Sequence, residues 1–128
     1  MGPGRELDGL VAENVMGWRE CKIGIERDIK GRAGFGLERP GQFRLSFPEY
    51  STNISDAWLV VEKLAGDGHA LALQAPGSTD MNEAYREFTR WTADFGTNNI
   101  SGYTEANGDT APHAICMAAL KIVGYSFP

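Results

Sequence analysis

The chain has 128 residues, of which 42% are hydrophobic and 23% are charged. This length and composition are typical of one ordinary globular domain, residues 1–128, and exclude a disordered chain. The net charge of −5 argues against general binding to nucleic acid. No apolar run approaches the ~18 residues that a membrane span needs, and the N-terminal segment lacks the apolar region of a signal peptide. Cys21 and Cys116 lack metal-ligand spacing, so we expect free thiols in a cytoplasmic protein.

The first predicted element is a helix over residues 5–18. Apolar residues recur there at helical spacing from Leu7 to Trp18. Glu6 and Asp8 occupy the first turns, where the helix dipole favours acids. Gly17 indicates that the helix is ending as Trp18 arrives.

The next segment predicts a strand, a glycine-rich loop and a second strand. Residues 21–29 alternate between apolar and polar, which is typical of a strand. Residues 30–42 contain four glycines and a proline, so we expect a mobile loop. Phe43 to Phe47 alternates again. The two strands could therefore form a hairpin across the glycine loop.

A second helix is predicted over residues 53–65. Asn53 is the expected N-cap, with Asp56 as its capping partner, although Ser51 or Thr52 could serve instead. Gly66 is expected to supply a left-handed stop. The buried side of this helix is predicted to consist of Ile54, Ala57, Trp58, Val61, Leu64 and Ala65.

The C-terminal half predicts strands followed by a last helix. A strand over 69–75 has His69, Leu71 and Leu73 on one face, and residues 78–84 are turn-like. A strand over 89–95 is expected to return through a partner strand over 101–107. The last helix, near 110–123, begins at Asp109–Thr110 with Pro112 in its first turn. Its broad apolar surface predicts deep burial.

These elements predict an α+β domain. We expect a three-layer α/β/α sandwich, in which helices near 5–18, 53–65 and 110–123 cover an antiparallel or mixed sheet.

Three segments carry a resemblance to a known family. They are RELDGLVAENVMGW (5–18), YSTNISDAWLVVEKL (50–64) and DTAPHAICMAALKIVG (109–124). Together they resemble the bacteriophage ABA sandwich domain proteins, which are small proteins of phages and prophages. The resemblance implies a three-layer α/β/α fold and a viral origin, but it implies no reaction. Residues 22–42 depart most from the family pattern, so any ligand specificity belongs to this chain.

No constellation of catalytic residues is apparent. His69 and His113 have no partner at metal-ligand spacing, and no GxSxG nucleophile motif occurs. Cys116 lies in a helix with a buried pattern, which is typical of an inert thiol. We therefore expect no enzymatic activity, no metal and no cofactor. A pair of carboxylates such as Glu105 and Asp109 remains the alternative for catalysis.

Positive charge is concentrated in one segment. Between Arg19 and Arg44 the chain carries seven basic residues and four acids, so this segment is +3 in a chain that is otherwise −8. Arg32, Arg39 and Arg44 could bind phosphate through their forked donors, and Phe35 could stack on a base. The alternative is a flexible hairpin tip with solvated arginines.

The start of the second helix is the other candidate site. One residue among Tyr50, Ser51, Thr52 and Asn53 suffices to cap the helix, and the remaining hydroxyls lie at its positive end, where anions bind. Tyr50 could stack on a base. Thr110, at the start of the last helix, is a weaker site of the same kind. Trp18 precedes the basic segment directly and could flank a ligand pocket there.

These features predict a non-enzymatic phage accessory protein that binds a small anionic ligand. Its most concrete form is a counter-defence sponge, which sequesters a nucleotide immune signal in the cytoplasm of the infected bacterium. By analogy with small sponges, we expect a homo-oligomer. One alternative is a protein-interaction module that inhibits or recruits a host factor. The other is an enzyme that degrades a nucleotide signal.

Overall fold

The computed structural model describes residues 1–17, 19–27, 33–39, 42–44, 48–77, 79–80, 86–96 and 105–127, with side chains described for 1–17, 48–77, 88–96 and 105–127. Trp18 and Arg32 lie outside these residues. In chain order the elements are α1 (Arg5–Asn14), β1 (Arg19–Arg27), β2 (Ala33–Arg39), β3 (Gln42–Arg44), α2 (Ile54–Gly66), β4 (Ala70–Gln74), β5 (Thr79–Asp80), β6 (Arg86–Glu87), β7 (Trp91–Gly96), β8 (Ala106–Gly108) and α3 (Ala111–Ile122).

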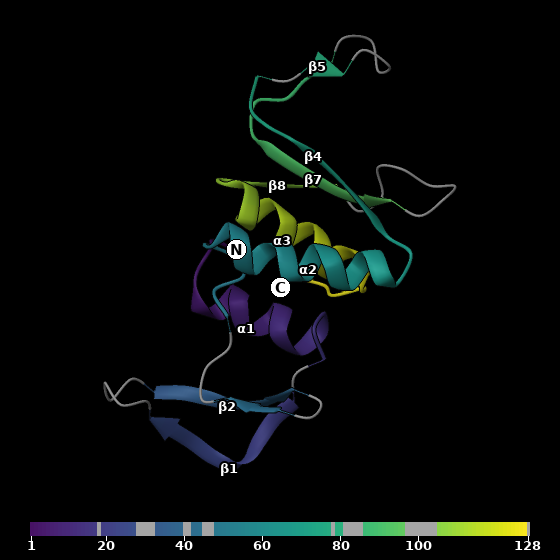
Figure 1. The fold of residues 1–128 in the computed structure, drawn as a ribbon. Coiled ribbons are helices and arrows are strands. Elements are labelled where there is room, and N and C mark those ends of the chain that lie inside the picture. Colours follow the sequence, from purple (N-terminus) through teal and green to yellow (C-terminus); the bar gives the residue numbers. More distant parts are fainter. Residues whose placement is uncertain are drawn as a thin grey trace.

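The described strands form antiparallel sheets, and helices pack against the β4-β7-β8 sheet. One sheet has the order β4-β7-β8, another the order β1-β2-β3, and β5 pairs with β6. Helix α3 packs on β7 and β8, α2 packs on β4 and α3, and α1 packs on α3. Figure 1 shows the three helices on the same side of the β4-β7-β8 sheet, with the β1-β2-β3 sheet beyond α1. The expected α+β sandwich is confirmed.

The core is centred on α3. Its residues Ala114, Ile115, Cys116, Ala118, Ala119 and Leu120 are all fully buried. The missing side chain of Gly108 allows β8 to approach this helix closely, because a side-chain carbon there would lie 2.8 Å from the Cα of Ala114. The deep burial predicted from the broad apolar surface of this helix is thus confirmed.

The caps of α2 and α3 form as the sequence predicts. The Asn53 side chain accepts from the backbone N–H of Asp56, and the Thr110 hydroxyl accepts from that of His113. Two details differ. The Asp56 carboxylate accepts from the N–H of Glu49, outside the helix. The left-handed residue after α2 is Gly68 (φ 92°), since Gly66 is still helical.

Helix α1 is shorter than expected. It ends at Asn14 rather than at residue 18, and the backbone N–H groups of Val15 and Met16 both bond to the carbonyl of Val11. Gly17 then adopts φ 77°. Because only glycine takes this left-handed conformation without strain, the glycine ends the helix before Trp18.

The expected loop over residues 30–42 was wrong, because most of it is strand β2. Its glycines alternate with Ala33, Phe35 and Leu37, so a strand pattern is present beneath the glycine content. The hairpin partner was wrong as well. Strand β2 pairs with both β1 and β3, whereas β3 was expected to pair with β1. Similarly, Thr79 and Asp80, expected in a turn, form β5.

The predicted buried side of α2 was partly wrong. Ala57, Val61 and Leu64 are buried as expected, together with Val60, but Ile54 and Trp58 are 50% and 49% exposed. Ala65 is also exposed. The helix is turned so that Val60 faces the core in place of Trp58. An apolar stripe wider than one contact face cannot indicate which part of it the fold will cover.

Candidate functional site

The entrance to α2 is mostly buried. Tyr50 is 1% exposed and Ser51 is fully buried, whereas Thr52 and Asn53 are exposed. Tyr50 belongs to the hydrophobic core. Its ring is therefore enclosed by protein and does not present a face on which a base could stack.

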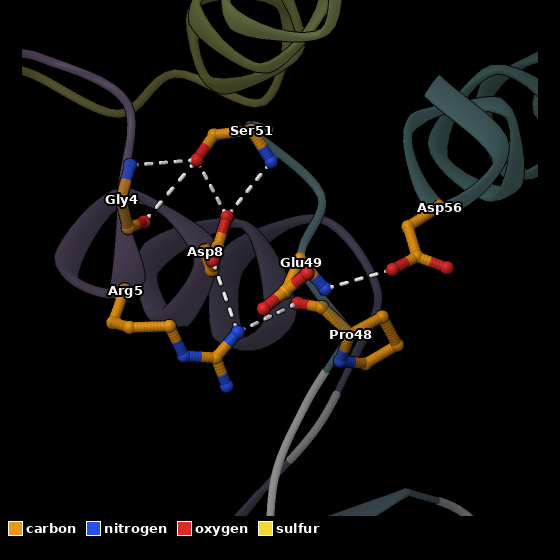
Figure 2. A network of polar contacts seen from close by, with 7 residues as sticks. All are labelled: Gly4, Arg5, Asp8, Pro48, Glu49, Ser51 and Asp56. Carbon is orange, nitrogen blue, oxygen red and sulfur yellow. Dashed lines mark hydrogen bonds and ion pairs between the residues drawn. The ribbon is translucent and has the colours of Figure 1, made fainter. Parts of the chain in front are cut away.

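Ser51 takes part in a buried polar network with the first turn of α1 (Figure 2). Oδ1 of Asp8 accepts from the Ser51 backbone N–H at 2.7 Å and from the Ser51 hydroxyl at 2.6 Å. The hydroxyl oxygen accepts from the N–H of Gly4 at 2.9 Å. Oδ2 of Asp8 accepts from Arg5, which also lies 3.4 Å from the carbonyl oxygen of Pro48. This network joins α1 to the segment that leads into α2.

The network uses the Ser51 hydroxyl, one of the groups that the sequence indicated as surplus to capping. Both the donor and the acceptor of the Ser51 hydroxyl are occupied, and the residue has no contact with solvent. Ser51 therefore holds two helices together. At this entrance the accessible hydroxyl is that of Thr52. Sequence reasoning assigned Asp8 only a helix-dipole role, because no local pattern indicates a contact 43 residues away.

The β1-β2-β3 sheet brings together three predicted ligand-binding residues. In an antiparallel sheet, paired residues share a face, and so does every second residue along a strand. Leu37 pairs with Arg44, and Phe35 and Arg39 are two residues to either side of Leu37. Phe35, Arg39 and Arg44 thus occupy positions on one face. We call these three positions the arginine face.

The three positions of the arginine face lie close to one another across β2 and β3. Arg44 is diagonal to both Arg39 and Phe35, a relation that separates positions by about 7–8 Å. Arg27, which pairs with Ala33, belongs to the same face further along β2. Sequence reasoning missed Arg27 as a site residue, although its position two residues after Ile25 places both residues on the same face of the strand. Arg19 pairs with Glu38 and so belongs to the opposite face.

The start of α3 holds the last of the predicted site residues, Thr110. The exposed Thr110 caps the helix, and Arg90 forms an ion pair with Asp109 at 3.0 Å. Buried His113 accepts from the N–H of Asp109 at Nδ1 and lies 2.8 Å from the carbonyl oxygen of Met1 at Nε2. This geometry assigns the ring proton to Nε2, since Nδ1 is an acceptor.

Little in the described part of the chain resembles a catalytic or metal centre. No group of three or more His, Cys, Asp or Glu residues there could hold a metal ion. Nδ1 of His69 is buried without a hydrogen-bond partner among those residues. None of the described helices is both long and apolar enough to cross a membrane.

Cys116 is a free, fully buried thiol. Burial raises its pKa, and the negative charge of Asp8 raises it further. Because the thiolate is the reactive form, we expect Cys116 to resist alkylation. In a Cys21→Ser variant at pH 8, iodoacetamide should leave the native protein unmodified for hours and label it within minutes in urea. Rapid labelling of the native protein would contradict this burial.

Helices α2 and α3 pack on the antiparallel β4-β7-β8 sheet, and a second sheet carries the arginine face. This arrangement is that of an α+β sandwich protein. The profile of the phage ABA sandwich domain matches residues 9–120. The chain therefore belongs to the phage ABA sandwich domain family. A solved structure, the 2.0 Å crystal structure of a phage protein from Bacillus cereus ATCC 14579, is similar at 26% identity and a TM-score of 0.56. The match covers 94% of this chain and 91% of that one. A comparison with curated proteins gives no match.

Proposed function

We propose that this phage-family protein binds a small anionic ligand of the nucleotide type at the arginine face. The observation that carries the proposal is the register of β2 and β3, which gathers Phe35, Arg39 and Arg44 on one face of a sheet. Arginine forks recognise phosphate oxygens in pairs, and an aromatic ring offers a plane on which a base stacks. A nucleotide combines these two features.

The charge distribution supports an anion rather than a neutral ligand. The segment from Arg19 to Arg44 is +3, and the rest of the chain is −8. A local positive surface in an acidic protein attracts small anions, while the overall charge repels long nucleic acids. The ligand is thus expected to be small.

The function that follows is sequestration. In this proposal the protein is a non-enzymatic sponge that acts against host defence in the cytoplasm of the infected bacterium, where it withdraws a nucleotide immune signal. Sequestration requires tight binding and no bond breaking, so the arginine face suffices. The working form is a homo-oligomer.

A second candidate function is a protein-interaction module. The exposed apolar residues Ile54, Trp58 and Leu59 on α2 favour it, because a tryptophan that is half exposed is typical of binding surfaces.

Isothermal titration with cyclic dinucleotides and with ADP-ribose tests the proposal. Binding should be detected for at least one of them, and chromatography after denaturation should recover that nucleotide intact. Recovery of an altered nucleotide would replace sequestration with catalysis. An absence of binding to all of them would overturn the proposal and favour the interaction module.

A further inference from the structure

Among the described strands, β4 is an outer strand of its sheet, and its own sequence carries none of the residues that usually protect an edge. Its five residues, ALALQ, pair with β7 in an unbroken register, and no other described strand pairs with it. Natural edge strands are protected by lysine, proline or a bulge, because unpaired N–H and C=O groups recruit further strands. Strand β4 has none of these features, and Ala70 and Ala72 are exposed.

The exposed side of α2 is also unusually apolar. Ile54, Trp58 and Leu59 (40% exposed) lie on it, together with Ser55, Ala65 and Gly66. Its charged groups are few: Lys63 is paired with Asp67 at 2.8 Å, which leaves Glu62. A surface helix normally presents a polar face to water. The composition of α2 is instead that of a helix with contacts on both sides.

These two surfaces belong to the same part of the molecule. Helix α2 packs against β4, whereas α3 covers β7 and β8. The apolar helix is therefore the one that packs against the outer strand, on the helical side of the sheet (Figure 1). A single partner that extends the sheet at β4 would meet α2 as well.

We propose that this partner is a second copy of the chain, placed by a two-fold axis perpendicular to the sheet. Such an axis pairs β4 with β4 in the antiparallel sense, so the edge is self-complementary and the two three-stranded sheets become one of six strands. The same axis sets the two α2 helices antiparallel. With full overlap, Ile54 at the start of one helix lies opposite Gly66 at the end of the other.

Charge complementarity supports a second copy over a charged partner. A basic or acidic peptide would find only Glu62 unpaired on the exposed side of α2 and no charge on β4, whereas a second copy brings an equally charge-poor strand and helix face. Charge-poor surfaces of this kind are typical of homodimer interfaces. This inference specifies the oligomer of the proposed function, but it holds whether or not a nucleotide binds.

Light scattering coupled to size-exclusion chromatography, without nucleotide, tests the interface. The wild-type chain of 13.9 kDa should elute with twice that mass at about 100 µM. Trp58→Glu places a charge on α2, and Ala72→Lys places one on the β4 edge. Both variants should elute as monomers with an unchanged far-UV circular dichroism spectrum.

Two variants serve as matched controls. Trp58→Phe keeps an apolar ring on α2, and Asn107→Lys adds the same charge as Ala72→Lys to β8, the other outer strand. Both should remain dimers. A monomeric wild type would overturn the proposal, and so would a dimer that Trp58→Glu and Ala72→Lys leave intact. Neither result depends on whether the arginine face binds a nucleotide.

Discussion

Replacing Asp8 with alanine is expected to lower the free energy of unfolding by about 2–4 kcal/mol. The carboxylate is fully buried and accepts both the backbone N–H and the hydroxyl of Ser51. Without it, a buried N–H loses its partner and a void opens between α1 and the entrance to α2. The bond from Arg5 contributes little, because that side chain is 47% exposed. Urea denaturation followed by tryptophan fluorescence measures the loss.

Two further variants make the test of Asp8 specific. Asp8→Asn keeps an oxygen that can accept from Ser51, so it should cost about 1 kcal/mol. Glu13→Ala removes an exposed acid from the same helix and should change stability by no more than about 0.5 kcal/mol. If Asp8→Ala were as mild as Glu13→Ala, the network would not join the two helices.

Replacing Gly108 with alanine is expected to cost about 2–3 kcal/mol. The added carbon would lie 2.8 Å from the Cα of Ala114 and 2.9 Å from the carbonyl carbon of His113. Both atoms are backbone atoms at the start of α3, so β8 and α3 must move apart. Thermal denaturation should show a midpoint lower by roughly 8–15 °C.

Gly66→Ala is the matched control for Gly108→Ala. Gly66 ends α2, and an added carbon there meets nothing within 4 Å. Alanine is the better helix former, so this variant should be unchanged or more stable by up to about 1 kcal/mol. Equal losses in the two variants would contradict a close approach of β8 to α3.

Local signals predicted most of the helical part of the fold. Asn53 and Thr110 cap α2 and α3 because each side chain needs only an N–H group three residues away. The end of α1 was harder to place, since apolar spacing continues to Trp18 while Gly17 turns the chain aside. The exposure of Trp58 depends on how α2 packs against α3, which no helical pattern specifies.

The candidate site was less accessible from sequence. Because of its glycine content, β2 was predicted to be a loop. Sequence reasoning therefore did not place Phe35 and Arg39 on the same face of a strand. Arg44 joins them only through the pairing of β3 with β2, a contact between strands rather than a local pattern. Ser51 looked available for a ligand, because its partner Asp8 is 43 residues away in sequence.

Isothermal titration of three proteins tests the central claim, that the arginine face binds a small anion. The wild type, Arg39→Ala/Arg44→Ala and Arg19→Ala are titrated with cyclic dinucleotides and ADP-ribose. Losing two charged contacts should weaken binding about 100-fold or more in the double variant. Arg19→Ala, on the opposite face of the same sheet, should bind within about threefold of the wild type. Equal binding by the wild type and the double variant would contradict the claim.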